Sequence, residues 1–153
     1  MKTENIVRIL REKLPEIAIR QEEDGSIRIE PSSIRDLALQ LRNTRELSFD
    51  FLVCSFAIDY LEKMEIVYIF HSYLHNHQVK IRAWIDRGNA VIATIEDLYP
   101  TANWHEREMY DLFGVTFKGH PDLRRLLLPD EWEGAPMRKD YTHENLVRRP
   151  ENK

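Results

Sequence analysis

The sequence is poor in cysteine, and Cys54 is the only one among 153 residues. A single thiol forms no internal disulfide, and without a Cys-x-x-Cys pair there is no framework for a structural zinc site or an iron–sulfur cluster. Because Cys54 lies in a strongly apolar run, we interpret it as a packed thiol rather than a nucleophile. These features favour a reducing compartment.

Glycine is also scarce, and its placement excludes the common phosphate-binding loops. The five glycines form neither the Gly-x-Gly-x-x-Gly loop of dinucleotide-binding folds nor a P-loop. No serine lies in a Gly-x-Ser-x-Gly elbow. The sequence therefore predicts no bound NAD, flavin or nucleotide.

The chain has neither a surplus of positive charge nor a long apolar run. Lys and Arg number 22 against 26 Asp and Glu, so the net charge of -4 gives no electrostatic reason to expect nucleic acid or an anionic membrane surface as the main partner. Apolar stretches fall well short of the roughly 20 residues that span a bilayer, and the first residues carry no signal-peptide core. We expect a soluble chain that is at most peripheral to a membrane.

Apolar residues make up 42% of the chain, which is enough for one packed core but not for two. Amphipathic periodicity predicts a helix over residues 3–14 and a second helix that begins at Ser32 or Ser33 and whose apolar stripe ends at Leu41. Between them, alternating apolar residues on both sides of a polar turn predict a small hairpin. Three further segments rich in β-branched and aromatic residues predict the strands of an antiparallel meander, namely 49–60, 64–74 and 79–85.

The second half is expected to be helical first and irregular afterwards. A helical turn is predicted over residues 94–100. Asn103, with Glu106 three residues later, is typical of a capping box and predicts a helix that ends at Gly114. Residues 117–141 show no sustained periodicity and predict an irregular segment that lies over the surface.

These elements predict an α+β fold, in which residues 1–141 form a single domain with helices packed against one face of a mixed or antiparallel sheet. Residues 142–153 are expected to form a short basic tail. The tail carries Arg148, Arg149 and Lys153. Residues 117–141 hold too many large apolar side chains for an unpartnered irregular segment, so we expect an interface there; the alternative is that they fold back onto the core. The side chains concerned are Leu123, Leu126, Leu127, Leu128 and Trp132.

The last predicted helix carries acids among apolar residues. On a helical wheel Glu108 falls between Trp104 and Leu112, and Asp111 lies on the other flank of Trp104, so the two acids are predicted to share an apolar face. Buried carboxylates need partners, which the guanidinium forks of the Arg124–Arg125 pair offer. We favour a structural ion-pair network; the alternatives are a solvated charged helix and a catalytic pair of carboxylates that handles protons.

The histidines give only a weak metal signal. His75 and His77 lie two residues apart at a predicted hairpin tip and His71 precedes them, but no third ligand stands at a defined spacing. His120 is better interpreted as a turn residue whose ring bonds nearby backbone, with an acid–base role as the alternative. We expect no metal site.

A set of residues in the second half resembles a known family signature. The signature residues are Glu106, Arg107, Glu108, Asp111, Leu112, Phe113, His120, Arg124 and Arg125. Flanking matches occupy 47–50, 57–60, 128–134 and 136–141. Over roughly residues 47–141 the chain is similar to the 30 kDa subunit of respiratory complex I, the NADH:quinone oxidoreductase of bacteria.

The resemblance implies a non-redox subunit of the peripheral arm of a proton-translocating complex, on the cytoplasmic side of the cell membrane. The implied partners are the large quinone-site subunit (the 49 kDa type), the subunit with the terminal iron–sulfur cluster and other complex I subunits, with no nucleic acid and no membrane insertion. The implied contribution is assembly and placement in support of electron transfer to quinone, so we expect the isolated chain to hold no cofactor and to be non-catalytic. Many relatives continue past the segment matched at 136–141 and wrap the large subunit, whereas only 142–153 follow here.

On this resemblance we assign structural or interface roles to ten residues. They are Glu106, Arg107, Glu108, Asp111, His120, Arg124, Arg125, Trp132, Arg138 and Lys139. A sibling alternative is the equivalent subunit of an energy-converting hydrogenase or of a complex fed by ferredoxin or a deazaflavin. From a different class, a stand-alone acid–base enzyme would use Glu108, Asp111 and His120.

Overall fold

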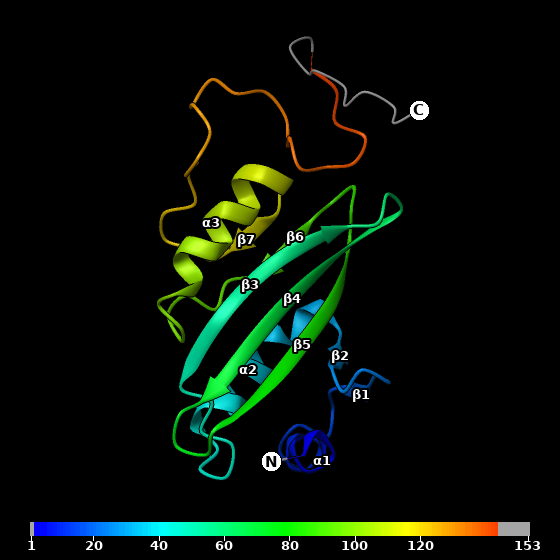
Figure 1. The fold of residues 1–153 in the computed structure, drawn as a ribbon, viewed down its shortest axis with the longest axis vertical. Coiled ribbons are helices and arrows are strands. Elements are labelled where there is room, and N and C mark those ends of the chain that lie inside the picture. Colours follow the sequence, from blue (N-terminus) through cyan, green and yellow to red (C-terminus); the bar gives the residue numbers. More distant parts are fainter. Residues whose placement is uncertain (1, 144–153) are drawn as a thin grey trace, which may run out of the picture.

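The computed structural model describes residues 2–143, so the predicted basic tail falls almost entirely outside the described residues. Along the chain the elements are α1 (Thr3–Lys13), β1 (Arg20–Gln21), β2 (Ile27–Ile29), a 3₁₀ turn (Pro31–Ser33), α2 (Ile34–Asn43), β3 (Phe51–Asp59), β4 (Lys63–Ser72), β5 (His77–Asp86), β6 (Val91–Ala93), α3 (Ala102–Phe113) and β7 (Thr116–Lys118). Helices pack with a five-stranded mixed sheet, which confirms the predicted α+β fold (Figure 1).

The five-stranded sheet has the strand order β1-β2-β5-β4-β3. The predicted meander is confirmed, because β4 pairs antiparallel with both β3 and β5. The predicted hairpin is present as the antiparallel β1–β2 pair, but its first strand begins at Arg20; Ile17 and Ile19 pack against the core instead of joining the ladder. A parallel pairing of β2 with β5 makes the sheet mixed.

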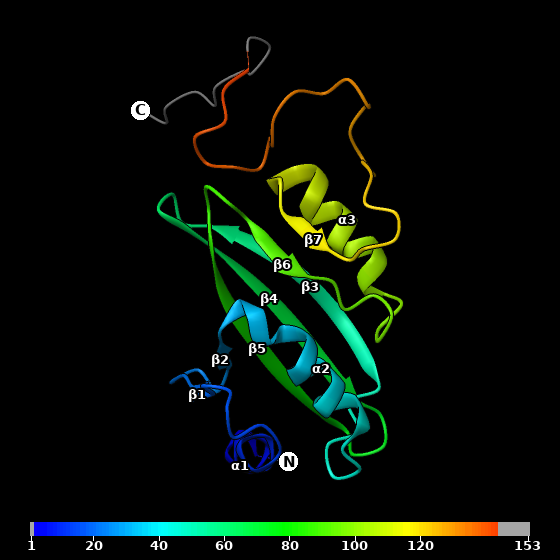
Figure 2. The same cartoon turned by 180° about the vertical axis from the view of Figure 1, so that it is seen from behind.

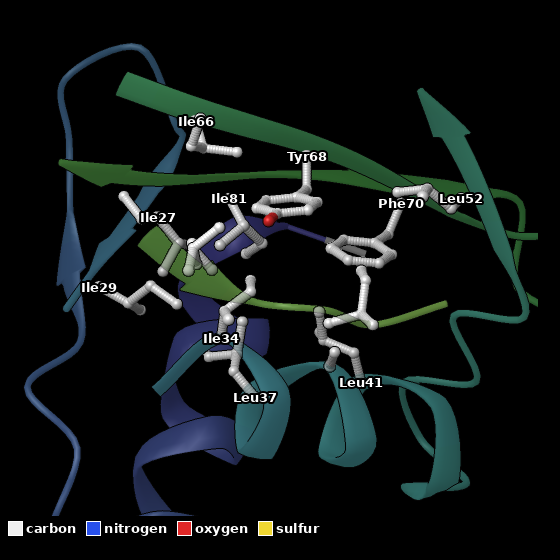
Figure 3. Packing of buried hydrophobic residues seen from close by; sticks show 14 of the residues in the cluster. Ile27, Ile29, Ile34, Leu37, Leu41, Leu52, Ile66, Tyr68, Phe70 and Ile81 are labelled. Atoms are coloured by element: carbon white, nitrogen blue, oxygen red, sulfur yellow. The ribbon is translucent and has the colours of Figure 1, made fainter. Parts of the chain in front are cut away.

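The main core lies between the sheet and α2, with α1 beside it (Figure 2). The predicted apolar stripe of α2 is fully buried and consists of Ile34, Leu37, Ala38 and Leu41. In Figure 3 the side chains of Ile34, Leu37 and Leu41 point toward the sheet, which carries Tyr68, Phe70 and Ile81. Burial of each such Leu or Ile contributes about 2 kcal/mol, so this layer supplies much of the stability on which the rest of the molecule is built.

α3 lies along the outer edge of β3, where His105 Nδ1 accepts a hydrogen bond of 3.3 Å from Ser55 N. A covered edge has fewer backbone groups open to pairing with another chain. The helix ends at Gly114 as predicted, in the left-handed conformation with φ of 69° that glycine adopts without strain. The predicted capping box is wrong: Thr101 is the N-cap, without a side-chain hydrogen bond, and Asn103 already lies inside the helix.

A second, two-stranded parallel sheet formed by β6 and β7 was not predicted. β6 is apolar throughout and shows no alternating pattern, and β7 occupies part of the stretch that we expected to be irregular. The helical turn predicted between them is present, because Ile95 O accepts hydrogen bonds from Leu98 N and Tyr99 N.

After Lys118 the described chain forms only turns and bends, as predicted, and passes over the end of α3 (Figure 1). We call residues 119–143 the C-terminal segment. In the part of the chain that the structure describes, none of the helices combines the length and the apolar character needed to cross a bilayer.

Candidate interface site

Asp111 of α3 holds the C-terminal segment through four hydrogen bonds. Its Oδ2 accepts from the backbone N atoms of Leu126, Leu127 and Leu128 at 3.0, 2.6 and 2.9 Å. Its Oδ1 accepts from Arg125 Nη1 at 2.8 Å. Burial by itself raises the pKa of the Asp111 carboxyl, but the three amides and the guanidinium outweigh burial, so the pKa lies below its usual value. The carboxylate is therefore ionised and its acceptor positions are occupied.

Arg107, one turn before Asp111, binds the adjoining stretch of backbone. Its Nε and Nη2 donate to the carbonyls of Arg124 and Arg125 at 3.4 and 3.3 Å. Arg125 Nη2 in turn donates to Trp132 O at 2.5 Å. Asp111 and Arg107 of α3 thus bind backbone groups of the C-terminal segment that have no partner in a β-sheet.

A second buried carboxylate, Asp59 at the end of β3, fixes the far part of the segment. It accepts from Arg87 Nε and Leu61 N at 2.8 and 2.9 Å, and from Lys139 N at 2.9 Å. Arg87 also pairs with Asp140. The Arg87 guanidinium, assisted by the two backbone amides, holds the pKa of Asp59 well below its usual value despite burial. Residues 80 positions apart in the sequence are tied together by this one side chain.

Glu106 of α3 is also a buried carboxyl, and it differs from Asp111 and Asp59. It accepts hydrogen bonds from Ile95 N at 2.9 Å and from the Thr94 hydroxyl, and no basic side chain of residues 2–143 forms an ion pair with it. Burial raises its pKa to about 7. Glu106 therefore joins α3 to the turn after β6 as a carboxyl that is largely protonated below neutral pH.

The prediction that Glu108 shares a buried face with Asp111 is wrong. Trp104, Glu108 and Leu112 do form one stripe, but the stripe faces outward, since Trp104 is 58% exposed and Glu108 is exposed. The acid of α3 that is buried in addition to Asp111 is Glu106, which we did not predict to be buried. The spacing in the sequence could have shown this, because Glu106 lies four residues after Ala102 and three before Met109, on the buried stripe of the helix.

Of the two arginines predicted to pair with acids, Arg125 pairs with Asp111, which confirms that part of the network. Arg124 instead forms an exposed pair with Asp122 at 3.0 Å. His120 is confirmed as a turn residue bonded to backbone: its Nδ1 accepts from Asp122 N at 3.1 Å, which leaves the proton on Nε2, 3.4 Å from Asn103 O. Because Glu108 is exposed and the Asp111 oxygens are occupied, these residues do not form a shared proton-handling site.

The histidines near the β4–β5 turn bind main-chain carbonyls. His75 Nε2 lies 3.0 Å from Arg45 O, and His77 Nε2 lies 3.0 Å from Leu47 O. Within residues 2–143 no three His, Cys, Asp or Glu side chains are placed to hold a metal ion. Cys54 lies half-buried on β3, and burial raises the pKa of its thiol.

Some apolar side chains of the C-terminal segment pack against the core of this domain, and others are exposed, as an interface requires. Leu123 packs against the core, as the alternative expected. Leu127 and Met137 are 61% and 55% exposed. Because the hydrogen bonds to Asp111 and Asp59 fix the backbone next to these two residues, the segment presents them on an ordered surface.

Comparisons with known proteins identify the family of the chain. A family model described as the 30 kDa subunit of respiratory-chain NADH dehydrogenase matches residues 27–146. An NADH-quinone oxidoreductase subunit from Roseiflexus sp. is 39% identical over 137 residues, which cover 86% of this chain and 79% of the relative. The corresponding subunit from Chlorobium phaeobacteroides is 44% identical over 109 residues, which cover 69% and 66% of the two chains.

Two solved structures share the fold. A trypsin-resistant fragment of Nqo5 superposes with a TM-score of 0.63 at 26% identity, over 80% of this chain and all of the fragment. A chain of an archaeal membrane-bound sulfane sulfur reductase superposes with a TM-score of 0.72 at 27% identity, over all of this chain and 98% of that one. The resemblance seen in the sequence is confirmed, and the chain belongs to the family of the 30 kDa subunit of respiratory-chain NADH dehydrogenase.

Proposed function

We propose that this chain is a non-redox scaffold subunit in the peripheral arm of a proton-translocating NADH:quinone oxidoreductase. It supports assembly and electron transfer to quinone and carries no redox centre itself. The observation that carries the proposal is the C-terminal segment, whose backbone is fixed by Asp111 and Asp59 while Leu127 and Met137 stay exposed. The NADH-quinone oxidoreductase relatives provide the complex in which such a surface has partners.

The energetics of this surface favour association. Covering a large apolar side chain contributes roughly 1.5–3 kcal/mol, and Leu127, Met137 and Trp104 are each more than half exposed. Binding also costs the entropy of ordering flexible loops. Here the hydrogen bonds to Asp111 and Asp59 already meet that cost within the folded chain, so less of the contact free energy is lost on assembly.

Our proposed partners are the large quinone-site subunit and the subunit with the terminal iron–sulfur cluster. The proposed location is the cytoplasmic side of the cell membrane, where the chain is held through its partners. We propose residues 1–141 as the unit that enters the complex. The isolated chain is proposed to be non-catalytic, because the Asp111 carboxylate is saturated with donors and Glu108 stands apart from it.

A sibling function has an observation in its favour. The likeness to a chain of an archaeal membrane-bound sulfane sulfur reductase extends over this whole chain. The same module therefore serves at least one respiratory membrane complex with a different name, and the equivalent subunit of a hydrogenase or of a ferredoxin- or deazaflavin-fed complex is our second candidate.

The experiment that tests the proposal is purification of the tagged chain, expressed at its native level, from membranes solubilised in mild detergent. We expect the quinone-site and iron–sulfur subunits to be recovered with it, together with NADH:quinone reductase activity. Recovery of hydrogenase subunits without NADH oxidation supports the sibling function instead. Recovery of the chain alone, from cells in which the complex is otherwise assembled, contradicts both.

A further inference from the structure

A cavity of about 460 Å³ opens between the end of α3 and the C-terminal segment. Its walls include Tyr110 and Gly114 on one side and Gly134, Arg138 and Tyr141 on the other. A methyl group on Gly134 would lie only 2.7 Å from the Tyr141 ring, so glycine is needed for this wall to close. The volume falls within the range of pockets that enclose small ligands.

The Arg138 side chain is held in the wall by a hydrogen bond from Nε, and its two Nη groups are free in the described part of the chain. Its Nε donates to Phe113 O at 2.8 Å, at the C-terminal end of α3. Its side chain packs over Gly114, where an added methyl group would lie 3.4 Å from Nη2. Within residues 2–143, Nη1 and Nη2 of Arg138 make no hydrogen bond or ion pair. The guanidinium is therefore positioned before any ligand arrives.

The other charged groups in the wall are already paired. Arg125 binds Asp111 at 2.8 Å. Asp140 pairs with Arg87, and this contact lowers the pKa of the Asp140 carboxyl. Of the charges that line the cavity, Arg138 is the one without an acidic partner in the described chain. The cavity thus presents a fixed positive charge beside aromatic and small residues.

We propose that this cavity, the Arg138 pocket, receives the side-chain carboxylate of an Asp or Glu from a partner subunit. The two free Nη groups form a planar fork that can donate to both carboxylate oxygens, and such charge-assisted pairs are strong and specific in direction. Because Nε is already bonded, little side-chain entropy is lost when the pair forms. The inference rests on the proposed function, since it requires a partner subunit.

The test uses Arg138→Lys, which places an amine in the pocket, in the complex purified through a tag on this chain. A water-soluble carbodiimide joins an amine to a carboxylate in contact with it and takes up the water that is lost. We expect mass spectrometry to find position 138 linked to an Asp or Glu of a partner subunit. The matched control is Arg124→Lys, because Arg124 is exposed and pairs within its own turn; it should not link to that acid.

A second variant measures the contribution of the pair. Arg138→Gln removes the charge and should lower the amount of chain recovered in the complex by roughly tenfold, whereas Arg124→Gln should not. Arg138→Gln also removes the hydrogen bond from Nε to Phe113 O, so thermal melting of the isolated variant checks that the chain still folds. The amount recovered in the complex is divided by the amount of folded chain.

The outcomes separate the two proposals. The pocket proposal is wrong if Arg138→Gln assembles as well as the wild-type chain and position 138 links to no acid of a partner subunit. The proposed function stands in that case, because the wild-type chain still assembles. If acetate shifts the Arg138 side-chain signals of the isolated chain in NMR spectra while no link to a partner forms, the ligand is a free carboxylate and the proposal of a partner side chain is also wrong. If the wild-type chain recovers no partner, both proposals fail.

Discussion

Arg125 and Asp111 form an ion pair of 2.8 Å in which the acid is fully buried and the arginine side chain is 21% exposed. The pair joins α3 to the C-terminal segment, and the same carboxylate accepts three backbone amides. Removing one partner from a buried pair leaves the other without compensation, which costs more than the pair contributes in total.

We predict that Arg125→Ala lowers the free energy of unfolding by about 3 kcal/mol, because the Asp111 carboxylate stays buried with only its amide donors. Arg125→Lys should lose less, since it keeps the charge but not the planar fork. Urea denaturation measures both. The control, Arg124→Ala, breaks an exposed pair and should stay within about 0.5 kcal/mol of wild type.

In the complex, Arg125→Ala should reduce the amount assembled and leave the quinone reductase turnover of the assembled fraction near normal. Normal assembly with a collapse of turnover would place Arg125 in catalysis or coupling and would contradict the structural role.

Acid should weaken the attachment of the C-terminal segment. The pKa of Asp111 is lowered in the folded state, so its contribution is fully present above the unfolded pKa and is lost as the pH falls through the folded value. We expect the wild-type free energy of unfolding to fall below about pH 5, and Asp111→Asn to show a smaller fall over the same range. An equal acid loss in both proteins would contradict the role of Asp111.

Glu106 should act in the opposite direction and in a different pH window. Its folded pKa of about 7 lies above its unfolded pKa, so its contribution is fully present below the unfolded value and is lost as the pH rises through 7. Glu106→Gln keeps a neutral side chain that can bond Ile95 N and Thr94. We expect this variant to exceed wild type by about 1–3 kcal/mol at pH 8 and to match it at about pH 4, below the unfolded pKa, as measured by urea unfolding.

The exposed apolar residues of the C-terminal segment should matter for assembly and not for folding. Leu127→Asp and Met137→Asp are expected to lower recovery of the chain in the complex while thermal melting of the isolated chain stays nearly unchanged. Leu74→Asp, at a 71% exposed position in the β4–β5 turn, controls for general effects on solubility. Hydrogen exchange adds an independent measurement, because equal protection of residues 119–143 in the free and assembled chain would rule out the interface.

The purified chain should be colourless and free of stoichiometric metal. One cysteine and the absence of nucleotide-binding loops in the sequence are the reasons for this expectation. Absorbance spectra and elemental analysis provide the measurement. A stoichiometric flavin, cluster or metal would contradict the scaffold proposal.

Local patterns in the sequence were sufficient for most of the regular elements and for the family. The meander, α2 and the end of α3 at Gly114 each follow from periodicity or from a terminating residue that acts over a few positions. β6 and β7 were not predicted because no short turn joins these two parallel strands and each strand needs the other to form.

Only the tertiary structure decided which acids are buried and what they bind. Periodicity places Trp104 and Glu108 on one stripe of α3, but the choice of the stripe that faces the protein depends on where β3 and the C-terminal segment lie. The bond from Lys139 N to Asp59 spans 80 residues and leaves no local trace. A buried carboxylate is stable where donors from distant parts of the chain converge on it, so its partners are a property of the folded chain and not of the neighbouring sequence.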